Sequence, residues 1–435
     1  MNQLKDRIVP RENLTPFILV TSLFALWGFA NDITNPMVSA FKTVLEISNT
    51  QASLVQLAFY GGYFTMAIPA ALFIKRFTYK TGILIGLGLY ATGALLFFPA
   101  ARTEQFGFFL IALYILTFGL AFLETTANPF ILSMGSEKTA TRRLNLAQSF
   151  NPVGSLLGMF IASRVILRAL ESDDTNAAGE LIYSTLEAGE KAAVRSHDLM
   201  MIRDPYVALG LFVLAMALVF LAVKMPSTAD SHKKLDFGGT FRRLMANARY
   251  REGVLAQTFY IGAQIMCWTF IIQYAENLGY SKSEAQDFNI IAMITFLSSR
   301  FITTWLMRYV KGANLMLICA LLGVGTLTGA IFIQGDLGLY CLMATSAFLS
   351  LMFPTIYGIA LDGLGEDAKL GSAGLIMAIV GGALTPPIQG SILDMGGDGY
   401  SDISILGVPE VNFSFILPLI CLLMVAVYSY RSKKG

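Results

Sequence analysis

The sequence predicts an all-α protein that crosses a membrane many times. Of its 435 residues, 55% are hydrophobic and only 14% are charged, whereas ordinary soluble domains carry about 25% charged residues. The mean hydropathy is +0.61. The charge-poor residues also fall into separate runs, each long enough to cross about 30 Å of hydrocarbon as a helix. The composition therefore indicates a polytopic membrane protein.

Twelve such runs follow one another, and we expect each to form one membrane-spanning helix. They cover residues 15–40, 52–74, 82–101, 106–134, 144–168, 205–223, 253–275, 287–307, 313–334, 337–361, 371–393 and 411–430. The first run is too long for a cleavable signal peptide and lacks a small-residue cleavage site, so it is predicted to be the first span.

Lys and Arg predict the orientation, because cytoplasmic loops carry an excess of these residues. Most of the 31 basic residues fall in cytoplasmic segments if both termini are cytoplasmic. An even number of spans agrees with termini on one side. The sequence therefore predicts a multi-pass protein of the inner (cytoplasmic) membrane with both termini in the cytoplasm.

Several function classes are disfavoured by composition. All four cysteines lie within predicted spans and both histidines lie in loops, so no metal or cofactor site is predicted. No nucleophile and base are paired in a way that suggests an enzyme. A net charge of +2 gives no reason to expect a nucleic-acid partner. We expect a monomer whose surroundings are the lipid bilayer.

The chain divides into two halves of six spans. The longest cytoplasmic connection, 226–250, is polar and separates a bundle at 1–225 from a bundle at 251–435. The fourth and tenth spans share a Phe-Leu pair followed by a Pro. Internal repeats with helix breaks are typical of secondary transporters. A second polar insert, 171–204, is expected to carry a short surface helix.

Two acids lie inside predicted spans. Glu124 stands in the middle of the apolar stretch 106–134, and Asp32 stands in the first span. A charged group at the centre of a spanning helix costs about 3 kcal/mol even on insertion scales, so such a group is a functional hypothesis by default. The alternative is a carboxyl held by neighbouring hydroxyls to fix helix packing. We predict that both acids couple a cation to transport.

Amides and aromatic side chains accompany these acids in five predicted helices. The candidates for substrate binding are Asn31, Asn35, Gln56, Asn128, Gln148, Asn151, Gln257, Tyr260, Gln264 and Trp268. Polar groups at membrane depth must be paired or must line a wet cavity. A sugar suits such a lining, since its hydroxyls donate and accept while its C–H face packs on an aromatic ring such as Trp268. The alternative for each amide is an interhelical hydrogen bond, worth less than about 2 kcal/mol.

One basic residue, Arg300, lies deep in a predicted span. Two interpretations remain open. Its long side chain can extend to the cytoplasmic interface, or it can form a gate contact that exists in only one access state.

Motifs along the whole chain resemble the L-fucose permease branch of the major facilitator superfamily. They occupy Leu26–Trp27, Gln56–Tyr63, Leu123–Phe130, Arg143–Asn151, Tyr260–Trp268 and Phe353–Ile356. The resemblance implies the major facilitator fold of two six-helix bundles, alternating access, and uptake of fucose or a related hexose with a proton. Under it, Glu124 matches the family's essential glutamate, and Gln148 and Asn151 match its substrate-side amides.

The chain departs from the family's pattern at two positions. The family's first-span aspartate falls on Asn35, and Asp32 lies three residues earlier, on the same helical face. Phe353, a further candidate pocket residue, stands where a tyrosine is expected, which removes one hydroxyl.

These observations together predict a sugar:proton symporter. One rival is a sodium-coupled hexose symporter, since several oxygen donors of the kind a hard cation takes lie near the first acid: Asp32, Asn31, Thr34, Asn35 and Thr125. Another rival is a sugar sensor that uses the fold without net transport, although the chain has no sizeable soluble signalling domain.

Overall fold

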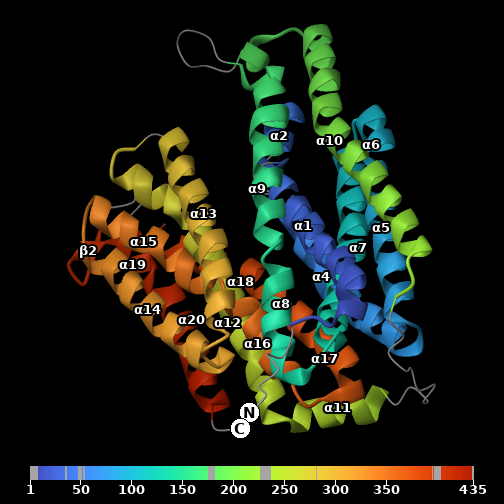
Figure 1. Ribbon diagram of the computed structural model, residues 1–435. Coiled ribbons are helices and arrows are strands. Elements are labelled where there is room, and N and C mark those ends of the chain that lie inside the picture. The colour runs from blue at the N-terminus through green and yellow to red at the C-terminus, as the bar shows by residue number, and fades with distance from the viewer. Residues whose placement is uncertain are drawn as a thin grey trace, which may run out of the picture. The chain divides into compact units, whose positions relative to one another are not determined.

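The computed structural model describes residues 8–34, 37–47, 51, 54–174, 182–225, 237–280, 282–393, 395 and 403–433. Within these residues, twelve helical segments are long and apolar enough to cross a membrane. Each overlaps one of the twelve predicted runs, so the predicted all-α polytopic fold is confirmed (Figure 1).

The first half of the chain contributes these helices: α1 (Leu14–Thr34), α2 (Met37–Val44), α4 (Leu54–Arg76), α5 (Tyr79–Leu95), α6 (Phe97–Thr103), α7 (Phe106–Ser133), α8 (Ala140–Gln148), α9 (Asn151–Ile161) and α10 (Ala188–Ala222). The second half contributes α11 (Phe237–Ala246), α12 (Ala248–Asn277), α13 (Lys282–Leu306), α14 (Gly312–Phe332), α15 (Asp336–Leu349), α16 (Met352–Leu361), α17 (Ala368–Met377), α18 (Gly381–Leu393), α19 (Glu410–Ser414) and α20 (Ile416–Ser432). A two-residue antiparallel pair, β1 (Ser404–Ile405) and β2 (Val408–Pro409), precedes α19.

Three spans are built from consecutive shorter helices. The fifth span passes from α8 to α9, the tenth from α15 to α16, and the eleventh from α17 through a 3₁₀ turn at Ala378–Val380 to α18. Pro152 and Pro354 lie just beyond the first two interruptions. Proline has no N–H and its ring clashes with the carbonyl four residues earlier, so it opens a helix there.

The described chain forms two compact units. One comprises Met1–Asn13, Asn128–Pro152 and Lys234–Gly435, and the other comprises Leu14–Ala127 and Val153–Lys233. Segment 128–152, from the fourth and fifth spans, therefore packs with the second half of the chain. The six-plus-six division of the sequence at 226–250 stays a prediction, because the units record which segments pack together in one conformation.

In the described part of the insert 171–204, the expected surface helix is not a separate α-helix; only 3₁₀ turns at Glu171–Asp173 and Ile182–Thr185 precede α10. Residues 188–204 instead form the first part of α10, which continues into the sixth span as one 35-residue helix. The capping box of Glu187 and Glu190 starts this helix. The polar sequence of the insert thus extends a spanning helix beyond its apolar part.

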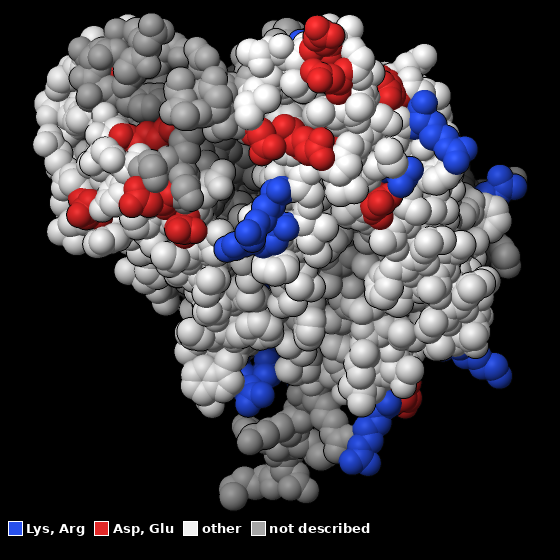
Figure 2. All heavy atoms as spheres, turned by 90° about the horizontal axis from the view of Figure 1, so that it is seen from above, with Lys and Arg blue, Asp and Glu red and all other residues white. Residues whose placement is uncertain are grey.

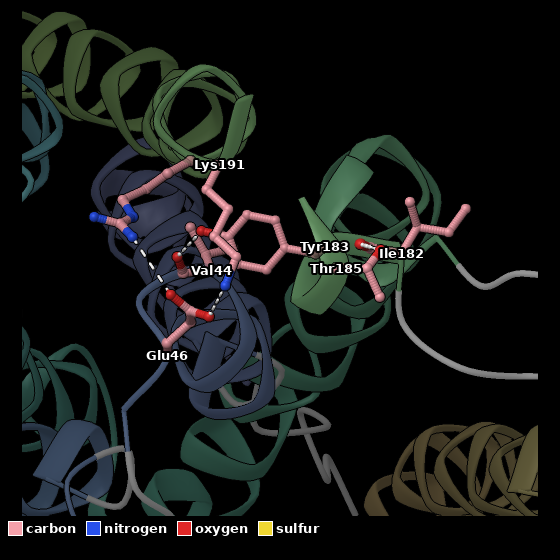
Figure 3. Close-up of polar contacts among 7 residues, drawn as sticks. Val44, Glu46, Ile182, Tyr183, Thr185 and Lys191 are labelled. Atoms are coloured by element: carbon pink, nitrogen blue, oxygen red, sulfur yellow. Dashed lines mark hydrogen bonds and ion pairs between the residues drawn. The ribbon is translucent and has the colours of Figure 1, made fainter. Parts of the chain in front are cut away.

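Three contacts tie the insert to the end of the first span (Figure 3). The Tyr183 hydroxyl donates to the Val44 carbonyl at 3.0 Å, and Lys191 Nζ lies 2.7 Å from Glu46 Oε1. Arg195 approaches the other oxygen of Glu46 at 3.6 Å. Exposed ion pairs of this kind are worth less than about 1 kcal/mol each, so they position the insert and contribute little to stability.

The surface carries large apolar side chains, as a lipid-facing surface should. On α10, Leu211, Phe212, Leu218 and Leu221 are all more than half exposed. Figure 2 shows one face on which small groups of charged side chains are separated by wide areas without charge. Exposed apolar area on this scale is rare in soluble monomers and agrees with a membrane protein.

Candidate functional site

Glu124 of α7 is buried and is held by a phenol. Only 5% of it is exposed, and the Tyr63 hydroxyl donates a 2.7 Å hydrogen bond to its Oε1. The donor is neutral, so this bond orients the carboxyl group without supplying a counter-charge. An acid in this position changes the charge of its surroundings when it binds or releases a proton.

Small residues on α4 bring Tyr63 to Glu124. A Cβ at Gly62 would lie 2.8 Å from the Cβ of Thr117 on α7, which is closer than real side chains approach. Only glycine lets the two helices pack this closely, and the next residue is Tyr63. The sequence analysis did not assign Tyr63 a role; the Gly-Gly-Tyr run at 61–63 was the available signal.

Asp32 lies on α1, half-buried, and interacts electrostatically with the half-buried Tyr60 of α4. Asn35, the position of the family's first-span aspartate and a candidate for substrate binding, lies outside the described residues, as does the side chain of Gln56. Asn31 is half-buried on the same helix as Asp32. The coupling role of Asp32 therefore stays a prediction.

Two of the proposed sodium ligands are buried hydroxyls. Thr34 donates to the Ala30 carbonyl at 2.7 Å and shares a 2.9 Å hydrogen bond with Tyr206, whose ring stacks on Phe97 at 3.9 Å. The hydroxyl of Thr34 is thus engaged by α10. Thr125 is fully buried on α7. Within the described chain there is no cluster of three or more His, Cys, Asp or Glu side chains that could hold a metal ion.

Gln148 and Asn128 form a buried pair. The Gln148 amide donates to Asn128 Oδ1 at 2.8 Å, and both side chains are at most 3% exposed. Gln148 is the last residue of α8 and Asn151 is the first of α9, so the two amides that the resemblance singled out flank a helix interruption. Interrupted helices form the binding sites of many transporters.

Arg300 of α13 is 3% exposed and does not extend to the surface. Its Nη1 donates to the Gln148 carbonyl at 2.9 Å, and its Nε donates to the Ser350 carbonyl at 2.5 Å. These carbonyls stand at the C-terminal ends of α8 and α15, where helix dipoles favour a cation.

Prolines explain why these two carbonyls are free. Gln148 lies four residues before Pro152, and Ser350 lies four residues before Pro354. In a continuous helix, the residue at each proline position would have donated to that carbonyl, but proline has no N–H. The guanidinium of Arg300 takes the place of both missing donors.

Tyr260 and Gln257 lie one turn apart on α12, fully buried. The Tyr260 hydroxyl and both polar atoms of the Gln257 amide have no hydrogen-bond partner among the described residues. Buried polar groups are normally paired, so this side of α12 presents unfilled hydrogen-bonding capacity. Tyr260 also interacts electrostatically with Arg300, and its ring lies 6.5 Å from that of Phe353.

Trp268 lies further along the same helix. Its indole N–H donates to Ser346 at 3.2 Å, and its ring meets Phe296 edge-on at 5.0 Å. The Arg300 guanidinium lies over this same Phe296 ring, with its central carbon 4.5 Å from the ring centroid. Gln264 is half-buried between Tyr260 and Trp268 on α12.

A contact that the sequence analysis missed joins α8 to α16. The Asn145 amide donates to the Thr355 hydroxyl at 3.2 Å, and both side chains are fully buried. A Cβ at Gly358 of α16 would lie 2.8 Å from the Thr141 hydroxyl of α8, so only glycine permits this approach. Asn145 and Thr355 lie inside the motifs Arg143–Asn151 and Phe353–Ile356 that the resemblance singled out, which was the only signal in the sequence.

Several predicted residues therefore form one series of contacts within the unit that contains segment 128–152. It runs from Asn128 through Gln148 to Arg300, and from there to the aromatic pair Phe296–Trp268. Among the described residues, Tyr260 joins this series only through its electrostatic interaction with Arg300. The two acids lie in the other unit, where Glu124 accepts a hydrogen bond from Tyr63 and Asp32 interacts electrostatically with Tyr60. Substrate binding, coupling and gating by these residues stay predictions.

Comparisons with known proteins agree along the whole chain. Residues 20–386 match the family model of the Major Facilitator Superfamily. The chain is 59% identical over 432 residues to an L-fucose-proton symporter of Haemophilus influenzae (99% of each chain). It is 34% identical over 436 residues to the L-fucose-proton symporter of Escherichia coli (99% of this chain, 96% of that one). Among solved structures, it resembles the transporter FucP in the outward conformation, with a TM-score of 0.86 at 32% identity over 97% of this chain and 99% of that one.

Proposed function

This chain belongs to the Major Facilitator Superfamily, a family of transporters and not of enzymes, and from that premise we propose that it carries L-fucose or a related hexose into the cell together with a proton. The named relatives support this proposal, since the two with 59% and 34% identity are L-fucose-proton symporters and cover nearly the whole chain. A more distant relative, 29% identical over 424 residues (96% of this chain and 93% of that one), is a glucose/galactose transporter of Brucella abortus.

The observation that carries the proton part of the proposal is the Glu124–Tyr63 pair. A buried carboxyl group oriented by a neutral phenol gains or loses a full charge with one proton. A carrier whose two access states hydrate such a group differently will bind and release the proton on different sides. A potential of 100 mV supplies about 2.3 kcal/mol per charge, and one pH unit supplies about 1.4 kcal/mol. Together they allow a few-hundred-fold accumulation of sugar per proton.

The sugar part rests on the polar face of α12. Gln257 and Tyr260 offer a buried amide and a buried hydroxyl without partners among the described residues, and Trp268 offers an aromatic face further along the same helix. The hydroxyls of a hexose both donate and accept, so they match this set. The loss of a hydroxyl at Phe353 leaves an apolar ring beside Tyr260, which suits the methyl group of a 6-deoxy sugar.

The test is uptake by the purified protein in sealed proteoliposomes. We expect labelled L-fucose to accumulate when a pH gradient, acidic outside, is imposed in sodium-free buffer. D-Galactose, D-glucose and N-acetylglucosamine serve as competitors to rank the sugars. Accumulation that needs a sodium gradient would move the proposal to the sodium-coupled alternative. Binding without accumulation under any gradient would favour the sensor.

The displaced aspartate gives a second expected result. We predict that Asp32→Asn impairs accumulation severely, and that adding Asn35→Asp restores part of it. The sequence spacing carries this expectation: in an uninterrupted helix, positions three residues apart share a face and lie about 5 Å apart along the axis, so an acid at either one would reach the same side. Uptake of L-fucose under a pH gradient is the measurement. Normal accumulation by the single variant would leave Glu124 as the only coupling acid.

We further propose that the protein works as a monomer in the cytoplasmic membrane, with both termini in the cytoplasm, no cofactor and no nucleic-acid partner. The distribution of Lys and Arg supports the orientation.

A further inference from the structure

A cavity of about 320 Å³ lies at one end of the spans in the unit that contains segment 128–152. It is lined by the loop that joins α7 to α8, the start of α8, the loop that joins α13 to α14, and the start of α14. Four of its lining residues are basic: Lys138, Arg142, Arg308 and Lys311. No Asp or Glu stands among the lining residues that the structure describes, so the cavity is strongly positive.

These cations are not neutralised by the protein. None of the four forms an ion pair with a carboxylate among the described residues. Arg142 and Arg308 are close enough to repel each other electrostatically. The Nε of Arg142 is buried and has no acceptor in the described part of the chain. Gathering like charges without a partner costs free energy, which an anion would recover.

The neighbouring arginine shows the difference. Arg143 is fully buried, and its guanidinium donates to the carbonyls of Ile131 and Leu132 at the end of α7, at 2.7 and 2.5 Å, and to that of Ile8 at 3.0 Å. Arg143 therefore has a structural role, since its guanidinium N–H groups are bound by backbone carbonyls. Arg142 lines the cavity and keeps a donor free.

The start of α14 adds backbone donors to the same cavity. Leu315 donates the first hydrogen bond of the helix, to Lys311, so the N–H groups of Gly312 and Ala313 precede it. Lys311 provides no side-chain cap. Uncapped N–H groups and the positive end of the dipole of a 21-residue helix favour an anion.

We propose that this cavity binds a phosphate group, carried either by a soluble phosphomonoester or by a lipid headgroup. Lys and Arg side chains together with helix N–H groups are the donors that recognise phosphate. The volume is at the lower end of the range for small-molecule sites, about 300–1,000 Å³. None of the lining residues belongs to the substrate or coupling residues proposed above.

An anion bound in this cavity would affect the balance between conformations of the carrier, because the cavity is lined by two separate parts of the sequence. Lys138 and Arg142 come from the first half of the sequence, whereas Arg308 and Lys311 come from the second. A phosphate bound by both pairs bridges segment 128–152 to the second half of the chain. It therefore stabilises the arrangement in which α8 packs on α16, and a ligand that binds one arrangement better shifts the population toward it.

The experiment measures the Tm of the purified protein in detergent, with inorganic phosphate and with chloride at equal ionic strength. We expect phosphate to raise the Tm of the natural sequence by about 2–4 °C. In Arg142→Gln and in Arg308→Gln, most of this rise should disappear. A matched control is Arg242→Gln, an exposed arginine of α11 that does not line the cavity; it should keep the full rise.

Two readouts separate binding from general effects. The stabilisation that phosphate gives through exclusion from protein surfaces is the same in all variants, so only a difference between the cavity variants and Arg242→Gln supports the site. In chloride alone, the cavity variants should melt no lower than the natural sequence, because a repulsion has been removed. An equal phosphate response in all four proteins would overturn the proposal.

A second experiment shows whether the phosphate group belongs to a soluble ligand or to a lipid headgroup. The same proteins are placed in nanodiscs of phosphatidylcholine with or without phosphatidylglycerol. If phosphatidylglycerol raises the Tm and inorganic phosphate then adds nothing, the ligand is a headgroup. If inorganic phosphate acts equally in both membranes, the ligand is soluble. A response to neither in the natural sequence contradicts the proposal.

Discussion

Glu124→Gln should abolish accumulation of sugar while leaving sugar binding and exchange measurable. The amide has the shape of a protonated carboxyl group but cannot release a proton, so the variant stays in the loaded form. Tyr63 still has an oxygen to which its hydroxyl can donate, since Gln keeps one carbonyl, and the packing of α4 on α7 is retained. The measurement compares uphill uptake under a pH gradient with counterflow exchange at equal pH.

The control is Glu12→Gln, which removes a carboxylate from an exposed position and should transport normally. Tyr63→Phe removes the phenol and leaves the acid, so it should change the pH at which uptake is half-maximal and still permit accumulation. If Glu124→Gln concentrates sugar against its gradient, Glu124 is not the coupling site, whatever the other variants do.

Arg300→Lys should reduce uptake at least about tenfold, although it preserves the charge. The planar guanidinium donates at once to the carbonyls of Gln148 and Ser350, and a lysine ammonium, as a point charge on a flexible stem, cannot match this fork. Hydrogen bonds to charged groups are worth about 1.5–3 kcal/mol, so losing one of them shifts an equilibrium between two access states by tenfold or more.

Initial rates of L-fucose uptake, together with sugar affinity and protein yield, test this expectation. The matched control is Arg164→Lys, an exposed position in the same membrane protein, which should behave as the natural sequence. If Arg300 acts as a gate, the uptake rates of Arg300→Lys should fall while protein yield and thermal stability stay near normal. Wild-type uptake by Arg300→Lys would contradict the gating role.

The twelve spans could be predicted because hydrocarbon imposes its length and composition on each helix. Their ends were less accurate where polar residues extend a helix beyond the membrane, as in α10, whose 188–204 part has no apolar signal. The interruptions of the fifth and tenth spans were readable in principle from Pro152 and Pro354, since each proline frees a defined carbonyl.

The sequence did not predict which side chains meet across helices. Nothing in the hydropathy of α4 and α7 says that Tyr63 donates to Glu124; this follows from the close approach at Gly62. Likewise, Arg300 has no acid near it in sequence to announce a partner, because its acceptors are backbone carbonyls that exist on every residue.

The contact of Arg300 with main-chain oxygens has a consequence for how such a carrier can evolve. Gln148 uses its side chain toward Asn128 and its carbonyl toward Arg300. A substitution at 148 changes the side chain that meets Asn128 and leaves the acceptor for the guanidinium in place, because every amino acid supplies that oxygen. Under the predicted roles of the two residues, sugar recognition would depend on the side chain at 148 and the gate contact on its carbonyl, so the first could change in evolution without changing the second.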